Sequence, residues 1–211
     1  MSLETYRRRR NFRKTAEPRG KVRRSSSGRI FVVQKHASRR LHYDFRLEAE
    51  GVLKSWAIPV GPSTDPAQKR LAVQVEDHPL DYRDFEGEIE ENQYGAGTVM
   101  VWDRGTWTPH GDWKEGRKEG KLNFSLKGKK LRGSWTLVRF KGAKGAEGRT
   151  WLLIKSSDEA AKKSTWYDIT ASRRDSVKTG RSMEEIKARS KRPVKKAGHR
   201  QERQRASRKK E

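Results

Sequence analysis

The chain has 211 residues, 31% hydrophobic and 37% charged, with 51 Lys and Arg against 27 Asp and Glu and no cysteine. This composition excludes disulfides, thiolate metal sites, cysteine nucleophiles and one apolar core spanning the whole length. No apolar run approaches the roughly 20 residues of a membrane helix, and no apolar stretch follows the basic N-terminus as in a secretory signal. We therefore expect no membrane partner and a cytoplasmic location.

Positive charge is concentrated in the two flanks of the chain. Residues 1–29 carry a net charge of +9 and residues 172–211 a net charge of +11, whereas residues 30–171 carry only +4. We therefore predict a folded domain over 30–171 with basic, largely disordered arms that engage a polyanion. Nucleic acid is favoured over a membrane surface, because 172–211 contains no aromatic residue to insert. The alternative is that the arms only aid solubility.

Eight short segments of the central region have β-branched or aromatic residues bounded by Gly, Pro, Asp or Ser, as strands do. The pattern predicts an all-β fold, a small antiparallel barrel or sandwich. Helical signals are confined to short turns near 158–163 and a helix over 182–191 whose apolar face is thin. The predicted strands, in chain order, are 30–35, 41–48, 52–58, 70–76, 98–103, 121–126, 133–140 and 150–155.

The segment 41–48 is the most informative of these strands. Because side chains alternate faces, Leu41, Tyr43, Phe45 and Leu47 form one apolar face, and the other face presents His42, Asp44 and Arg46. His42 and Asp44 can reach one divalent ion above the strand. The short connection at 37–40 allows a hairpin that brings His36 beside His42. Two imidazoles and a carboxylate suit Mn²⁺, Fe²⁺ or Zn²⁺. The alternative is an ordinary solvent-facing strand surface.

A second polar cluster lies between Glu76 and Tyr82. His78 follows a predicted strand and precedes a proline turn. It is either a turn residue that satisfies a local backbone group, or a phosphate ligand or general acid. Taken alone, the pattern favours the turn residue.

These residues belong to four segments that resemble a known family. The segments are RNFRKTAEP from Arg10, QKHASRRLHYDFRLE from Gln34, RLAVQVEDHPLDYRDF from Arg70 and QYGAGTVMVWD from Gln93. The chain resembles the 3′-phosphoesterase domain of bacterial DNA ligase D over about residues 6–161. It looks like the free-standing form, because no ligase or polymerase sequence is attached.

The resemblance implies a closed β-barrel and a Mn²⁺-dependent enzyme of DNA repair by non-homologous end joining, with Zn²⁺ or Co²⁺ as other candidate metals. Such an enzyme removes a 3′ ribonucleotide to leave a 3′-phosphate and then hydrolyses the 3′-phosphate. Its partners would be DNA 3′ ends on a primer-template, with the Ku protein and a separate ligase as candidates. The implied metal ligands are His36, His42 and Asp44, the implied catalytic residues are Arg46, His78 and Tyr82, and the implied supporting residues are Arg10, Glu17, Gln34, Arg70 and Glu76.

Two positions depart from the family pattern. Asn11 stands where the family has aspartate, and Val60 stands where the family has lysine. Loss of these charges leaves the balance between the two substrates open. It also motivates an alternative function, a non-catalytic module that binds DNA ends and recruits other repair factors.

Overall fold

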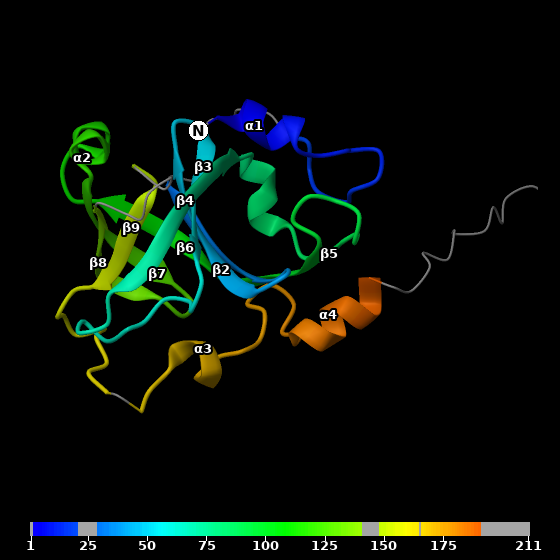
Figure 1. Ribbon diagram of the computed structural model, residues 1–211. Coiled ribbons are helices and arrows are strands. Elements are labelled where there is room, and N and C mark those ends of the chain that lie inside the picture. Colours follow the sequence, from blue (N-terminus) through cyan, green and yellow to red (C-terminus); the bar gives the residue numbers. More distant parts are fainter. Residues whose placement is uncertain (1, 21–28, 141–147, 165, 191–211) are drawn as a thin grey trace, which may run out of the picture.

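Antiparallel strands dominate the computed structural model, which describes residues 2–20, 29–140, 148–164 and 166–190 (Figure 1). Eight strands form a closed barrel, because β1 pairs with both β2 and β6. Neighbours around the barrel follow the order β1 (Ile30–Ala37), β2 (Leu41–Ala49), β3 (Val52–Ile58), β4 (Arg70–His78), β9 (Thr150–Lys155), β8 (Arg132–Arg139), β7 (Lys121–Gly128) and β6 (Gly97–Pro109).

The predicted eight-stranded, all-β barrel is confirmed, and every predicted strand is present. A ninth strand, β5 (Gly87–Ile89), pairs with the start of β6 outside the barrel. At three residues it is too short to carry an alternating pattern. It follows a 3₁₀ helix, η1 (Leu80–Asp84).

Aromatic residues fill the barrel interior. Trp56, Trp102, Trp135 and Trp151 are all almost completely buried. Trp113 of the helix α2 (Trp113–Glu119) packs edge-on against Trp107 of β6 with ring centroids 5.1 Å apart. The helix has regular ends, because the Asp112 side chain accepts a hydrogen bond from the Glu115 N–H and Gly120 adopts the left-handed conformation. A rigid barrel of this kind holds its outward-facing side chains in fixed positions.

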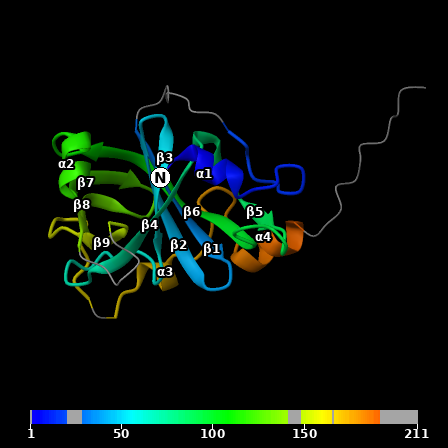
Figure 2. The ribbon, with the colours of Figure 1, turned by 45° about the horizontal axis from the view of Figure 1, so that its top comes forward.

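The N-terminal arm is ordered over residues 2–20, where the prediction of disorder is wrong. It forms the helix α1 (Leu3–Arg8), which packs against β4 (Figure 2). Tyr6 is fully buried, and its hydroxyl donates a 2.6 Å hydrogen bond to the Pro18 carbonyl. Gly20 is needed for the close approach of the arm, because a Cβ there would lie 2.0 Å from Pro79 Cβ. Residues 21–28 lie outside the described residues.

The C-terminal arm also contradicts the predicted boundary at residue 171, since the chain remains packed on the barrel as far as residue 190. Its helix α3 (Ile169–Ser172) is followed by α4 (Met183–Ser190), which lies against β5 and β6 and buries Ile186. The Ser176 and Thr179 hydroxyls donate 2.6 Å hydrogen bonds to Glu86. The helix predicted over 182–191 is thus present as α4, and residues 191–211 lie outside the described residues.

Of the short helical turns expected near 158–163, the structure has one turn, closed by a hydrogen bond from the Ala161 N–H to the Asp158 carbonyl, and no helix. Of the helices in the described residues, none is long and apolar enough to cross a membrane.

Candidate metal and phosphate-ester site

A cleft of about 460 Å³ opens beside the outer face of β2. Its walls come from Arg10 after α1, from β1 and β2 with the turn between them, from the end of β4, from η1 and from the loop that precedes β6. Eight of the eleven residues predicted for the site line this cleft, and these are Arg10, His36, His42, Asp44, Arg46, Glu76, His78 and Tyr82.

Three of these residues form a group able to hold a metal ion. The antiparallel register places His36 of β1 directly opposite His42 of β2, as the predicted hairpin requires. His36 Nδ1 and His42 Nε2 each lie 3.7 Å from Asp44 Oδ2. Ligand bonds of about 2.1 Å place neighbouring ligand atoms roughly 3–4 Å apart, so these spacings fit a single ion.

Backbone carbonyls orient both imidazoles toward that position. His36 Nε2 lies 2.9 Å from the Gly95 carbonyl, and His42 Nδ1 lies 2.9 Å from the Arg40 carbonyl. A carbonyl only accepts hydrogen bonds, so each of these nitrogens is the donor. The opposite ring nitrogen of each histidine then faces Asp44. Such outer hydrogen bonds are the usual way in which proteins fix metal-binding histidines.

Asp44 is held in its charged form. Burial alone would raise its pKa, but the Arg46 guanidinium and the two nearby imidazoles hold that pKa well below its usual range. For His42, burial alone would lower the pKa. The contact with Asp44 outweighs the effect of burial, and the pKa of His42 is raised. An anionic carboxylate between two imidazoles is an arrangement that attracts a cation.

Arg46 lies next to this group, with Nη2 3.1 Å from Asp44 Oδ2. Its Nε donates to Gln34 Oε1 and its Nη1 to Ser55 Oγ, both at 2.9 Å. Gln34 is in turn fixed, because its amide donates to the carbonyls of Tyr82 and Phe85. The buried guanidinium is therefore immobilised at the floor of the cleft.

His78 is enclosed by two guanidinium groups. Arg46 Nη1 lies 2.9 Å from His78 Nδ1, and Arg10 Nη2 lies 3.3 Å from His78 Nε2. Burial, and then the charges of Arg46 and Arg10, lower the pKa of His78 well below its usual range. The lowered pKa favours the neutral imidazole. His78 does satisfy a local backbone group, as the turn-residue interpretation expects, because its Nδ1 lies 2.9 Å from the Glu76 carbonyl, and it also lines the cleft.

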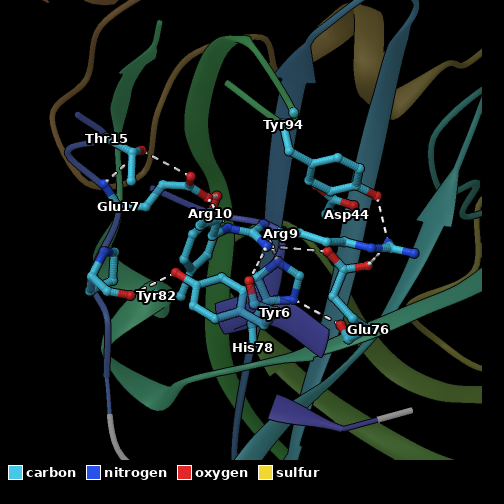
Figure 3. A network of polar contacts seen from close by, with 12 residues as sticks. Tyr6, Arg9, Arg10, Thr15, Glu17, Asp44, Glu76, His78, Tyr82 and Tyr94 are labelled. Atoms are coloured by element: carbon cyan, nitrogen blue, oxygen red, sulfur yellow. Dashed lines mark hydrogen bonds and ion pairs between the residues drawn. The ribbon is translucent and has the colours of Figure 1, made fainter. Parts of the chain in front are cut away.

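Two carboxylates tie the N-terminal arm to the barrel, as Figure 3 shows. Arg10 Nε donates to Glu17 Oε1 at 2.8 Å, and Arg10 Nη1 lies 3.3 Å from Glu76 Oε1. The Tyr82 hydroxyl donates to the same Glu17 oxygen at 3.0 Å. Burial and the neighbouring Glu17 raise the pKa of Tyr82, so its hydroxyl stays protonated.

The remaining three predicted residues do not line the cleft. Gln34 and Glu17 support lining residues from behind. Arg70 stands apart, because it begins β4 opposite Leu153 and lies about 20 Å along the strand from Glu76. Its Nε is buried without a hydrogen-bond partner in the described part of the chain.

Sequence reasoning missed Arg9 and Tyr94 in this cleft region. Arg9 Nη1 contacts Glu76 Oε2 at 3.0 Å and the Tyr94 hydroxyl at 2.8 Å. These contacts link residues 67 and 85 positions apart. In the sequence Arg9 belongs to a run of four arginines and Tyr94 to the segment that begins at Gln93, and neither feature indicates this pairing.

The two departures from the family pattern lie outside the cleft lining. Asn11 uses its side-chain oxygen to accept a hydrogen bond from the Arg13 N–H at 3.1 Å. Val60 lies in the turn after β3 and is 62% exposed. Neither residue interrupts the hydrogen-bond network around Arg46.

Comparison with known proteins identifies the family of the chain. Residues 34–139 match the family model described as the DNA ligase D 3′-phosphoesterase domain. The chain is 53% identical over 183 residues to the multifunctional non-homologous end joining protein LigD of Pseudomonas aeruginosa. It is 37% identical over 170 residues to the corresponding DNA repair protein of Mycobacterium tuberculosis. The matches cover 86% and 80% of this chain but only 22% of each relative.

Proposed function

Because the chain belongs to the 3′-phosphoesterase family of DNA ligase D, we propose that it is a Mn²⁺-dependent enzyme that heals DNA 3′ ends. It would remove a 3′ ribonucleotide to leave a 3′-phosphate, and then hydrolyse that phosphate to a 3′-hydroxyl. The single observation that carries this proposal is the 3.1 Å contact between Arg46 and Asp44. It supports the proposal because a guanidinium, a group suited to binding phosphate, lies beside the three residues that would hold the metal.

The metal would be held by His36 Nδ1, His42 Nε2 and Asp44 Oδ2. A mixed imidazole and carboxylate set suits Mn²⁺ and also accepts Zn²⁺ or Co²⁺. The bound ion would supply Lewis-acid polarisation of the phosphate ester. All three side chains line the cleft, where a substrate phosphate would enter.

The arginines would hold the phosphate oxygens. Arg46 is held in place by Gln34 and Ser55, so its guanidinium would bind an anion without first losing side-chain freedom. Arg10 lies on the other side of His78. The neutral His78 imidazole would act as a hydrogen-bonding partner of the phosphate, because an imidazolium acid is disfavoured between two guanidinium groups. The phenol of Tyr82 would contact the same phosphate from beside Glu17.

The substrate context comes from the relatives, whose names describe non-homologous end joining. The chain spans about a fifth of their length, so only this part of their role is carried over. We propose that it acts on DNA primer-template ends near the nucleoid, with Ku and a separate ligase as partners. Exposed arginines at the β1–β2 turn, Arg39 and Arg40, would contribute to DNA binding.

The test is turnover of labelled primer-templates that end in a 3′ ribonucleotide or a 3′-phosphate, with and without Mn²⁺. We expect His42→Ala and Asp44→Asn each to lower kcat by roughly a hundredfold or more, since outer residues alone are worth about 10–100-fold. His110→Ala is the matched control, because His110 lies outside the cleft and contacts Ser125. Undiminished activity of either cleft variant would refute the metal assignment. End binding without any metal-dependent product would instead support the recruiting module.

A further inference from the structure

One aromatic ring at the rim of the cleft has no part in the chemistry described above. Tyr94 belongs to the loop between β5 and β6, lines the cleft, and is 49% exposed. Of the aromatic residues that line this cleft, Tyr82 is buried, with 2% exposure. Tyr94 therefore offers an accessible aromatic surface beside the phosphate-binding residues.

The ring is held in place from the side of the N-terminal arm. The Arg9 guanidinium lies 5.0 Å from the ring centroid and donates a 2.8 Å hydrogen bond to the Tyr94 hydroxyl. Arg9 is anchored in turn by its 3.0 Å ion pair with the buried Glu76 (Figure 3). A cation stacked on an aromatic ring is favourable and fixes the plane of the ring.

The loop also fixes how far the ring lies from the candidate metal position. The Gly95 carbonyl, one residue after Tyr94, is the acceptor that orients His36. The turn is closed by hydrogen bonds from the Gln93 N–H to the Glu90 carbonyl and from the Ala96 N–H to the Gln93 carbonyl. Tyr94 is thus positioned by the same short loop that positions a metal-binding imidazole.

We propose that Tyr94 is the stacking platform for a nucleobase, namely the base of the nucleoside that carries the reacting phosphate on its 3′ oxygen. This inference rests on the proposed function and identifies the residue that recognises the nucleoside at that site. Both proposed substrates contain this nucleoside, whereas the nucleoside beyond the phosphate is present only in the diester. A nucleobase is separated from its own 3′-phosphate by one sugar. The Tyr94 ring lies at the rim of the cleft that would hold this phosphate.

A stacking platform suits an enzyme that must accept any end. Every nucleobase has a flat π-face, so stacking on an aromatic side chain tolerates all sequences. Arg9 stabilises the platform from the arm side and adds positive charge near the sugar-phosphate backbone. Tyr94 is therefore a specificity-determining residue that distinguishes a nucleoside phosphate from a small phosphate ester.

The experiment compares two changes, removal of the ring and removal of the base. The substrate is a 3′-phosphorylated oligonucleotide with either a normal or an abasic 3′-terminal nucleotide. With the normal substrate we expect Tyr94→Ala to raise KM about 5- to 150-fold with little change in kcat. With the abasic substrate we expect wild type and Tyr94→Ala to have similar KM values, because the platform then has nothing to stack on.

Two controls separate this role from a structural one. Tyr94→Phe retains the ring and is expected to keep KM within a few-fold of wild type, although it loses the hydrogen bond with Arg9. Trp166→Ala removes another exposed aromatic, one that lines a different pocket, and is expected to have no effect. If Tyr94→Ala weakens the abasic and normal substrates equally, the ring acts only on the loop and the proposal is overturned.

The same comparison is made by equilibrium binding of the two oligonucleotides, which does not need turnover. If wild type has no 3′-end activity, the proposed function fails, but a loss of binding specific to the base in Tyr94→Ala would still support the platform. Equal binding by wild type and Tyr94→Ala would refute the platform while leaving a measured activity intact.

Discussion

The state of His78 shows how neighbours decide the chemistry of a single residue. The sequence left this histidine open as a turn residue, a phosphate ligand or a general acid. In the structure it is buried between Arg10 and Arg46. Both neighbours come from segments far from residue 78 in sequence, so no local pattern predicts the resulting low pKa.

The depressed pKa of His78 has a consequence for stability. The imidazole is neutral when folded but binds a proton below about pH 6.5 when unfolded, so protonation favours the unfolded chain and stability falls as pH falls. We expect protonation linked to His78 to lower the free energy of unfolding by about 1 kcal/mol as the pH falls from 6.5 to 5.5. The measurement is denaturant unfolding of wild type and His78→Gln at both pH values without divalent ions. A wild-type loss no larger than the loss in His78→Gln would contradict this prediction.

At the scale of elements, the local patterns were sufficient for the strands and insufficient for the contacts between segments. The alternation in β2 correctly placed His42, Asp44 and Arg46 on one face, because the spacing of residues along a strand determines the face on which each side chain lies. The hairpin to His36 was also predictable, since its connection is short. The ordered arms were not, because Arg9 and Arg10 find Glu76 only across 66 or more residues.

One buried carboxylate organises the connection between β7 and β8. Asp103 of β6 is fully buried and accepts hydrogen bonds of 2.8–3.0 Å from the backbone N–H groups of Arg104, Lys129, Lys130 and Leu131. An asparagine at this position would point its side-chain NH₂ group, which is a donor, at some of these backbone N–H groups, which are also donors. We expect Asp103→Asn to lower the free energy of unfolding by about 2–4 kcal/mol, as for a disrupted buried charge.

Denaturant unfolding checks this value. The matched control is Asp84→Asn, because Asp84 is half exposed and its ion pairs with Arg83 and Arg104 lie on the surface. Surface pairs of this kind contribute about 0–1 kcal/mol. Equal effects of the two substitutions would show that the buried carboxylate does not hold the turn.

At the scale of the whole molecule, charge remains concentrated toward the ends of the chain. Residues 191–211 contain ten Lys and Arg against two Asp and Glu. If these cations bind DNA phosphates, their removal should lessen the dependence of affinity on salt, because fewer counterions are released. We expect deletion of 191–211 to give a shallower slope of log affinity against log salt concentration.

This measurement uses duplex DNA with a 3′ overhang, and thermal unfolding checks that the truncated chain is as stable as the wild type. Turnover of a saturating substrate at low salt is expected to persist, since no cleft residue is removed. An unchanged salt slope would show that the last 21 residues do not bind phosphate.

The docked arm, residues 2–20, can be regarded as a tethered ligand of the barrel. A covalent tether supplies an effective concentration on the order of mM for short flexible links, so modest contacts suffice to keep such a ligand bound. The ion pair of Arg10 with Glu76 of the barrel is nearly inaccessible to solvent, with side-chain exposures of 5% and 4%. Dissolved ions screen such buried pairs far less than they screen contacts between exposed arginines and DNA. Rising salt should therefore release the nucleic acid while the cleft itself stays assembled.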